Sequence, residues 1–150
     1  MTYYESPLGW LAISSNGSAI TKIQFVQEAG EEDTPDQVIN QTIEQLNEFF
    51  AGQRHTFDLP LAPEGTEFEQ KVWEQLQHIP YGATVTYGDI SRKLGDPNLM
   101  RAVGRANGKN PISIVVPCHR VIGSDNKLTG YAGGLPNKEW LLRHEGALLI

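Results

Sequence analysis

The stretch Phe57–Gln70, which reads FDLPLAPEGTEFEQ, places the strongest constraint on how this chain can fold. Its two prolines lack a backbone donor, and together with its glycine they prevent a helix or a central strand from running through it. A chain of 150 residues that is interrupted near its middle can still bury two small cores. We therefore expect one domain at residues 1–62 and a second at residues 63–150.

The first domain is expected to combine a β-hairpin with one helix. The run WLAISSNGSAITKIQFV holds two β-rich segments around Asn16 and Gly17, a pair that tolerates the positive φ angles of a tight turn. The apolar spacing then becomes helical, with Thr34 as the cap, Pro35 as the first residue and Gly52 after the end. The apolar stripe of this helix consists of Ile39, Ile43, Leu46 and Phe50. The pattern predicts a small α/β core without catalytic residues.

The second domain is expected to be mainly helical. Thr66 and Glu69 form a capping-box pattern that opens a helix before Pro80. The apolar stripe of that helix consists of Phe68, Val72, Leu76 and Ile79. A last helix is expected to begin at Asn137 and to end before Gly146. It carries Trp140, Leu141 and Leu142.

Between these helices the sequence predicts a close helix pair. Thr86 and Asp89 form a T-x-x-D pattern that opens the first helix, which ends at the next glycine. Asp96 and Pro97 follow as the cap and first residue of the second helix, which runs towards Gly108. The second helix carries two arginines, Arg101 and Arg105. Two helices joined by so short a turn are a helix-turn-helix candidate, although such pairs also serve as plain structural corners.

The charge differs between the two halves of the chain. The net charge of −6 alone disfavours a nucleic-acid partner. However, residues 1–80 carry 3 Lys/Arg against 13 Asp/Glu, whereas residues 81–150 carry 9 against 5. Between Ile90 and Arg120 the only acidic residue is Asp96. Charge runs usually mark a solvated surface, but this asymmetry is also typical of a basic binding module joined to an acidic one.

The composition excludes several kinds of protein. No apolar run approaches membrane-spanning length, and the start MTYYESPLGW lacks the layout of a signal peptide. A single cysteine cannot form an internal disulfide, so we expect a cytoplasmic protein. The four histidines show no paired ligand spacing such as HExxH, so no metal site is expected. No glycine-rich loop follows a strand, so no S-adenosylmethionine or other cofactor is expected.

The single cysteine, Cys118, is the candidate for chemistry. A lone cysteine is more often an inert small hydrophobe than a nucleophile. Here the β-branched run Ile112–Val116 predicts a strand that Pro117 ends, which would place Cys118 at a strand end. His119 and the arginine after it can supply positive potential that favours the reactive thiolate. Glu145, in HEG, offers a carboxylate that can orient an imidazole.

Five blocks of the sequence together resemble one known family. The blocks are TYGDIS, RAVGRANGKNP, PCHRVIG, GYAGGL and KEWLLRHEG, in that order. They are similar to the O6-alkylguanine-DNA alkyltransferases, also called methylated-DNA–protein-cysteine methyltransferases, from about Phe68 to the end of the chain. The first sixty residues match only in layout. The resemblance implies a small ribonuclease-H-like sheet with one helix, followed by a mainly α domain with a winged helix-turn-helix.

The resemblance implies a direct, irreversible DNA repair reaction. Cys118 would take the alkyl group from O6 of guanine and would act once. His119 would remove the thiol proton through a bridging water, and Glu145 would orient the imidazole. Tyr87 would donate a proton to the guanine ring, and Asn110 would tie the helix-turn-helix to the thiol. A thiol cannot reach an alkyl carbon inside a duplex with in-line geometry, so the nucleotide must be extruded.

The same resemblance implies the contacts with DNA. Arg101 would fill the gap left in the base stack, a task that suits a flat cation. The backbone carbonyls of Cys118 and Val121 would accept from the guanine amino group, and the N–H of Ala132 would lie close to O6. The implied DNA-binding positions are Tyr87, Arg101, Ala102, Gly104, Arg105 and Arg120. The implied base pocket consists of Pro117, Val121, Tyr131 and Ala132.

The implied partner is double-stranded DNA that contains O6-alkylguanine, bound by a monomer through the minor groove, with no membrane involved. Some members of the family hold zinc in the first domain, but this chain has no cysteine there. Ala132 is small and lacks a hydroxyl group, so the preferred alkyl group stays open. Alkylated thymine also stays open as a second substrate.

Three other functions are compatible with part of the sequence. A cysteine hydrolase would use Cys118, His119 and Glu145 as a triad, but it would leave Arg101 and the helix pair unexplained. A transcription factor would use the helix pair to read the major groove and would leave the thiol idle. An alkyltransferase-like protein binds lesions without repair, but in such proteins the acceptor cysteine is replaced.

Overall fold

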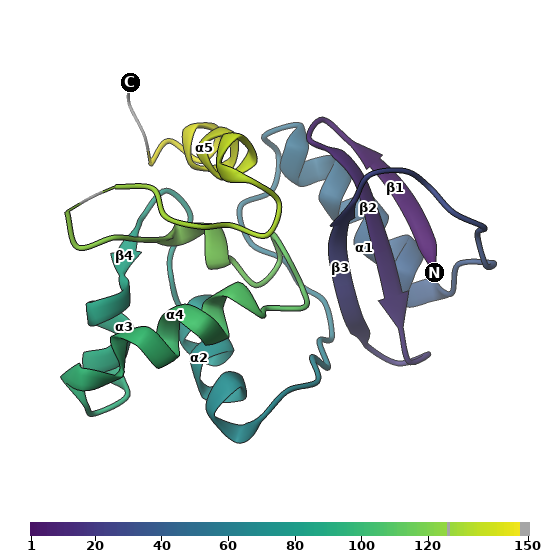
Figure 1. Ribbon diagram of the computed structural model, residues 1–150. Coiled ribbons are helices and arrows are strands. Elements are labelled where there is room, and N and C mark those ends of the chain that lie inside the picture. Colours follow the sequence, from purple (N-terminus) through teal and green to yellow (C-terminus); the bar gives the residue numbers. More distant parts are fainter. Residues whose placement is uncertain (126, 148–150) are drawn as a thin grey trace. The chain divides into compact units, whose positions relative to one another are not determined.

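The computed structural model describes residues 1–125 and 127–147 (Figure 1). Their contacts divide the chain into two compact units. The first unit contains Met1–Glu64 together with Pro111–Ser113, and the second contains Gly65–Asn110 and the chain from Ile114 onward. Among the helices of the described residues, none is long and apolar enough to cross a membrane.

The first unit is built on an antiparallel sheet of three strands, β1 (Thr2–Ser6), β2 (Gly9–Ser15) and β3 (Ile20–Val26). The hairpin expected from the sequence is confirmed as β2 and β3. Its turn centres on Asn16, whose side-chain oxygen accepts from the backbone N–H groups two and three residues later, both at 2.9 Å. Gly17 adopts a φ of 93°, a conformation that favours glycine. Strand β1 was not expected from the sequence.

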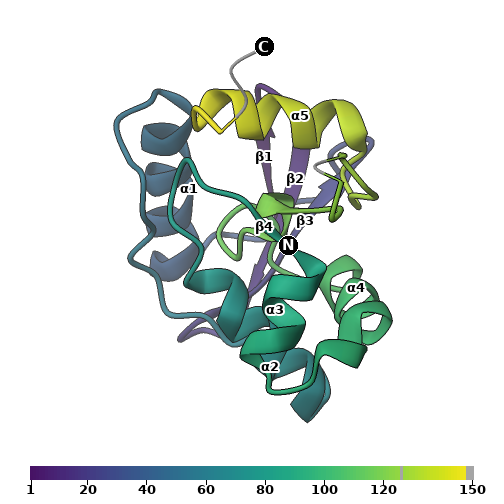
Figure 2. The same ribbon diagram turned by 90° about the vertical axis from the view of Figure 1, so that its left-hand side faces the viewer.

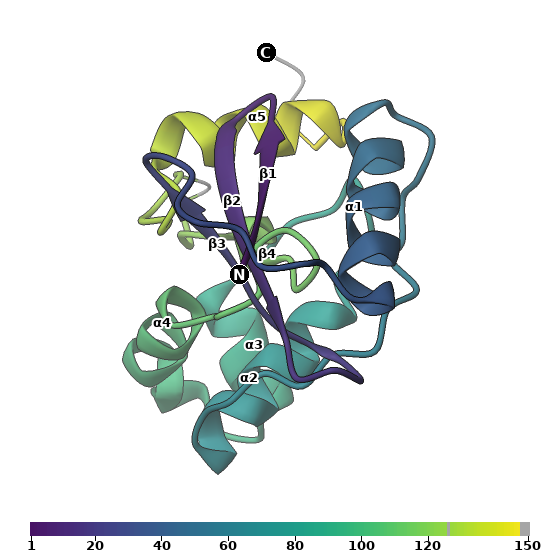
Figure 3. The same ribbon diagram turned by 90° about the vertical axis from the view of Figure 1, so that its right-hand side faces the viewer.

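The helix of the first unit, α1 (Gln37–Phe50), packs against β1 and β2 (Figure 3). The expected cap is wrong by two residues: Asp36, not Thr34, accepts from the backbone N–H three residues later at 2.9 Å. A carboxylate directly before the first turn satisfies a donor that the helix itself cannot. The buried side chains are Ile39, Thr42, Gln45, Leu46 and Phe49. Ile43 and Phe50, expected on this stripe, are half-buried at its edge.

Two segments distant in sequence pair with β3. Ile20 exchanges backbone hydrogen bonds with residues 60–62 at 2.8 and 2.9 Å. Ile23 does the same further along, because it donates to the carbonyl of Pro111 and accepts from the N–H of Ser113, both at 2.9 Å. The short segment Pro111–Ser113 therefore belongs to the sheet of the first unit, although its neighbours in sequence belong to the second.

The strand expected over Ile112–Val116 is wrong. Only Ile112 makes an isolated bridge, to Ile23, and the chain then turns. Ile114 has a φ of 73°, which a β-branched residue adopts only where its surroundings impose it. All five residues are buried. The β-branched run therefore reflects burial on every side rather than a strand.

The second unit is mainly helical. Its helices are α2 (Glu67–Gln77), α3 (Tyr87–Lys93), the short 3₁₀ helix η1 (Pro97–Leu99), α4 (Met100–Gly108) and α5 (Leu135–His144). Of these, α2, α3 and α4 pack against one another (Figure 2). A short parallel pair, β4 (Val85–Thr86) and β5 (Val121–Ile122), lies directly before α3 and after the segment that holds Cys118.

The expected helix pair is confirmed as α3 and α4, with small changes at its ends. Both capping boxes are present: the one at Thr66 opens α2, and the one at Thr86 opens α3. Asp96 caps η1 rather than α4, so the second helix of the pair begins only at Met100. The last helix begins two residues before Asn137, because a proline can occupy the first turn of a helix.

Candidate active site

Cys118 lies in a short turn of the second unit. It begins the 3₁₀ helix η2 (Cys118–Arg120), and only 5% of its surface is exposed. Asn110, just beyond the end of α4, holds this turn: its Nδ2 donates to the carbonyl of Val116 at 2.8 Å, and its side chain hydrogen-bonds to Cys118. The residue that the sequence analysis placed between the helix pair and the thiol is therefore in contact with both.

The thiol is protonated at rest. Burial raises the pKa of Cys118, whereas the hydrogen bond from Asn110 and the charge of Lys138 act in the opposite direction. A buried thiol with a raised pKa is a poor nucleophile until a base removes its proton. The site therefore needs a neutral base close to the sulfur.

His119 has the properties of such a base. Its Nε2 lies 2.8 Å from Oε2 of Glu145, and both side chains are fully buried. Burial lowers the pKa of His119 despite the opposing effect of Glu145, so the ring is neutral at pH 7. An ionised carboxylate only accepts hydrogen bonds, so Nε2 carries the proton and Nδ1 presents a lone pair. Nδ1 is buried and makes no hydrogen bond to the residues that the structure describes.

Glu145 is also held by a cation, Arg120. It forms the C-cap of α5, and its carboxylate accepts from Arg120 Nε at 2.8 Å and from Arg120 Nη2 at 2.9 Å. Burial alone would raise the pKa of Glu145, but the hydrogen bonds from His119 and Arg120 and the positive charge of Arg120 lower it to about 2. Glu145 is therefore ionised at neutral pH and fixes the tautomer of His119.

Arg120 lies in the interior and not at a DNA-facing surface. Besides Glu145 it binds the carbonyl of Ile79 at 2.7 Å, and its guanidinium lies 5.8 Å from the ring centre of Tyr81. Only 6% of Arg120 is exposed. A guanidinium engaged in this way is not available to a phosphate group. Arg120 thus supports Glu145 from inside, which differs from the DNA contact expected from the sequence.

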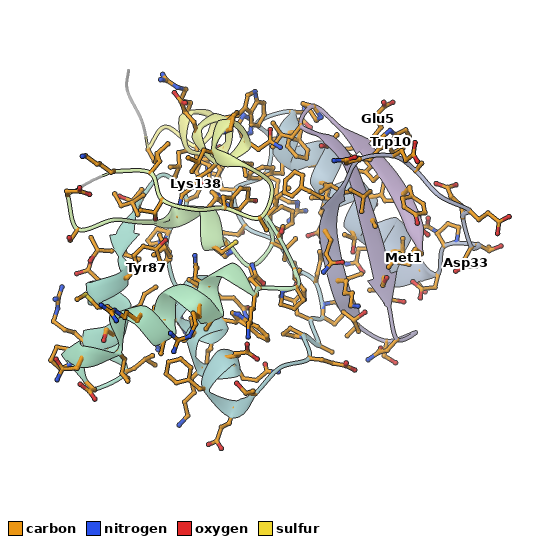
Figure 4. The ribbon with its side chains drawn as sticks, viewed as in Figure 1. Met1, Glu5, Trp10, Asp33, Tyr87 and Lys138 are labelled. Atoms are coloured by element: carbon orange, nitrogen blue, oxygen red, sulfur yellow. The ribbon has the colours of Figure 1, made fainter. Side chains whose placement is uncertain are left out.

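A second group of the expected residues lines an open cavity of about 410 Å³. Tyr87, the first residue of α3, donates or accepts a hydrogen bond of 2.5 Å with Thr129 Oγ1 at its wall (Figure 4). The cavity is lined by Tyr87, Gly88, Met100, Arg101, Gly104, Gly123, Ser124, Asp125 and Thr129. Arg101 and Arg105 are exposed on α4, and Ala102 and Gly104 are half-buried between them. The cavity therefore joins Tyr87 to α4.

The expected base-pocket residues differ in exposure. Pro117 and Val121 are buried on either side of η2. The ring of Tyr131 packs edge-on against His119, with ring centres 6.5 Å apart. Ala132 is exposed. Within residues 1–125 and 127–147, no group of three His, Cys, Asp or Glu side chains is arranged to hold a metal ion.

Two buried polar residues beside the thiol were missed by the sequence analysis. Lys138 on α5 is fully buried, and its Nζ donates to the carbonyl of Val121 at 2.6 Å and to that of Thr129 at 2.9 Å (Figure 4). Asn107 on α4 is 4% exposed, and its Nδ2 lies 3.4 Å from the carbonyl oxygen of Cys118. Each stands on the apolar face of its helix, which was the available signal: Lys138 shares its face with Leu141 and Leu142.

The fold and the site together define a class of protein in which a small α/β unit precedes a helix-turn-helix unit that carries an activatable thiol. The 6-O-methylguanine DNA methyltransferase family has this organisation. Its ribonuclease-like domain matches residues 1–63, and its DNA-binding domain matches residues 67–147. The chain belongs to this family.

Individual relatives agree with the family match. A methylated-DNA–protein-cysteine methyltransferase of Methanosarcina acetivorans is 45% identical over an alignment of 150 positions, which covers 96% of this chain and 96% of the relative. The crystal structure of Mycobacterium tuberculosis OGT in complex with DNA is 44% identical, has a TM-score of 0.88, and covers 97% of this chain and 92% of its own. The structure of Schizosaccharomyces pombe (S. pombe) Atl1 with DNA containing O6-carboxymethylguanine covers 55% of this chain and 79% of its own, at 35% identity and a TM-score of 0.50.

Proposed function

We propose that this chain repairs DNA by transferring the alkyl group from O6 of guanine to Cys118, once per molecule. The observation that carries the proposal is the buried contact in which Glu145 fixes a neutral His119, the residue next to Cys118 in the chain. The relatives named methylated-DNA–protein-cysteine methyltransferases support it, as does the neighbouring structure in complex with DNA.

The transfer can be written so that every bond is accounted for. The proton of Cys118 passes to Nδ1 of His119 through a water, and the imidazolium that forms is stabilised by Glu145. The sulfur lone pair forms a bond to the alkyl carbon as the bond from that carbon to O6 breaks. The electron pair goes to the purine, and Tyr87 protonates a ring nitrogen so that the base leaves as a neutral species. The resulting tyrosinate is neutralised by a proton from water, and the imidazolium of His119 returns its extra proton to water. The thioether is stable, and no group in the site could restore the thiol.

The damaged nucleotide must leave the helix to meet the thiol. Extrusion costs a few kcal/mol, and least for a mispaired alkylated base. Arg101, exposed on α4 at the cavity that Tyr87 lines, is suited to fill the vacancy in the stack. Arg105 would contact phosphate groups, with Ala102 and Gly104 allowing α4 to approach the minor groove closely.

Recognition of guanine is proposed to come from the backbone around the thiol. The carbonyls of Cys118 and Val121 would accept from the 2-amino group, and the N–H of Ala132 would donate to O6. The ring of Tyr131 and the side chain of Pro117 would form walls of the pocket. Activity on alkylated thymine stays open.

We also propose a cellular compartment, an oligomeric state and a role for each domain. We expect a cytoplasmic monomer, in which residues 63–150 carry the acceptor site and the acidic domain at residues 1–62 supports it. Asn110 would act as the joint between α4 and the thiol, through its contacts with Val116 and Cys118.

Mass spectrometry of the intact protein and its peptides tests the proposal. The protein is mixed with a duplex that contains one O6-methylguanine. We expect a gain of one methylene mass on the peptide that contains Cys118, limited to one per chain, and none with Cys118→Ala, which should still bind the duplex. No gain with retained binding would indicate lesion recognition without repair. No gain and no binding would favour a hydrolase.

A further inference from the structure

Both carbonyls proposed to read the guanine amino group already accept a hydrogen bond from a buried side chain. Lys138 Nζ donates to the carbonyl of Val121 at 2.6 Å, and Asn107 Nδ2 lies 3.4 Å from the carbonyl of Cys118. The two donors come from different helices, α5 and α4. Each of them hydrogen-bonds to one of these two carbonyl oxygen atoms.

The burial of Lys138 calls for an explanation. A lysine ammonium is strongly hydrated, and burial lowers the pKa of Lys138 to about 8 although the nearby Cys118 acts in the opposite direction. No Asp or Glu carboxylate of the described residues pairs with it. Its ammonium group donates to the carbonyls of Val121 and Thr129. A charge kept inside the protein to bind two carbonyls fixes the position of those carbonyls.

Lys138 also connects the turn that holds Cys118 to the cavity that Tyr87 lines. Val121 follows η2 directly, and the side chain of Thr129 binds the hydroxyl of Tyr87 at 2.5 Å. One ammonium group thus holds the strand after the thiol and the loop that contacts Tyr87. Figure 4 shows Lys138 and Tyr87 in the same unit of the protein.

Asn107 holds the other carbonyl from the DNA-binding side. It lies on the buried face of α4, the helix that carries Arg101. Its second polar atom, Oδ1, is buried and makes no hydrogen bond within the part of the chain that the structure describes. An unpaired buried oxygen destabilises the folded state, so an apolar residue would be the more stable choice here. Asn107 therefore has a use other than stability.

A carbonyl oxygen can accept two hydrogen bonds. When one donor is built into the protein, the direction of the oxygen is fixed and one lone pair is left for a ligand. Such preorganisation lowers the cost of ordering the site when a ligand binds.

We propose that Lys138 and Asn107 are positioning residues that aim the carbonyls of Val121 and Cys118 at the 2-amino group of the extruded guanine, and thereby set the preference for a purine that carries this group. The inference rests on the proposed function and adds the origin of its base selectivity.

Single-turnover rates on two substrates test this inference. Methyl transfer to Cys118 of the full-length protein is measured with duplexes that contain either O6-methylguanine or O6-methylhypoxanthine, which lacks the 2-amino group. The wild-type protein should prefer O6-methylguanine by roughly 10- to 100-fold, since without the amino group the second lone pair of each buried carbonyl has no donor. In Lys138→Met and Asn107→Leu this ratio should fall several-fold, mainly because the rate on O6-methylguanine decreases. The control is Lys71→Met, which replaces an exposed lysine on α2 and should leave the ratio unchanged.

The outcomes separate the inference from the proposed function. A purely structural role would slow both substrates equally in the two variants, and an unchanged ratio overturns the inference. A wild-type ratio near one also overturns it, because the amino group would then not be read. Absence of transfer by the wild-type protein on either substrate would instead refute the proposed function. If Lys138→Met does not fold, Asn107→Leu and Lys138→Arg carry the comparison, and the arginine variant should retain part of the preference.

Discussion

Replacing Glu145 by Gln removes one charge from a fully buried carboxylate that hydrogen-bonds to His119 and Arg120. The side chain keeps its shape, but His119 and Arg120 lose the anion that both contact. Glu145 has no exposed side-chain surface, so water cannot replace that charge without opening the site. We expect this single change to destabilise the protein strongly at neutral pH and hardly at all in strong acid.

The expected magnitude follows from the pKa of Glu145. The pKa falls from 4.5 to about 2 on folding, and at about 1.4 kcal/mol per unit this corresponds to about 3 kcal/mol. The cost of leaving one member of a buried ion pair alone is of the same size, about 3–5 kcal/mol. Because the pKa is lowered in the folded state, this stabilisation is present above pH 4.5 and is lost as the pH falls towards 2.

Urea unfolding, followed by tryptophan fluorescence, measures this effect. The difference in unfolding free energy between wild type and Glu145→Gln should be about 3 kcal/mol at pH 7 and should shrink steadily below pH 4.5. Glu139→Gln is the matched control, because Glu139 lies on α5, which Glu145 caps, has a side chain that is 44% exposed, and pairs with Arg143 one turn away. It should cost less than about 0.5 kcal/mol at every pH. A Glu145→Gln cost below about 1 kcal/mol at pH 7, or one independent of pH, would refute this reasoning.

Three further predictions concern the reaction with DNA. Burial lowers the pKa of His119, so the rate of methyl transfer in single-turnover assays should stay constant as the pH drops below 6.5 and should decline only in more acidic solution. A decline in rate centred above pH 6.5 would contradict a neutral buried base. Arg101→Ala should slow repair of duplex DNA more than reaction with a free O6-alkylguanine base, and equal losses in the two assays would remove its role in the stack. Binding to duplex DNA should weaken steeply with salt in a titration despite the net charge of −6, because phosphates would meet the basic residues of the second half; a flat response would count against DNA as the partner.

The parts of the fold that could be predicted from the sequence are those fixed by local chemistry. The capping boxes at Thr66 and Thr86 and the turn at Asn16 depend on hydrogen bonds within a few residues, and all three are present. The strand expected at Ile112–Val116 failed because a β-branched run indicates burial as well as a strand. Which of the two applies depends on β3, some ninety residues earlier in the chain.

The candidate site was predicted more completely in its residue types than in its geometry. Proximity of His119 and Glu145 was expected and is observed, at 2.8 Å. Arg120 was expected to face DNA, since a charged residue is normally exposed. Its burial depends on a hydrogen-bonded ion pair with Glu145, which lies 25 residues later in the chain at the end of α5. Lys138 was missed for the same reason: its carbonyl partners are brought to it only by the tertiary fold.

The segment Pro111–Ser113 has a consequence for how this protein can be divided. The chain leaves α4 at Asn110, pairs with Ile23 of the first unit, and then returns to reach Cys118. Cutting at the linker after Glu64 would therefore not release two self-sufficient pieces, since the fragment with the thiol would lose the strand partner of the chain just before it. The first unit thus supplies the pairing partner of Pro111–Ser113, the segment that leads to the turn of Cys118. A functional exchange between relatives would need to move Ile23 and Pro111–Ser113 together.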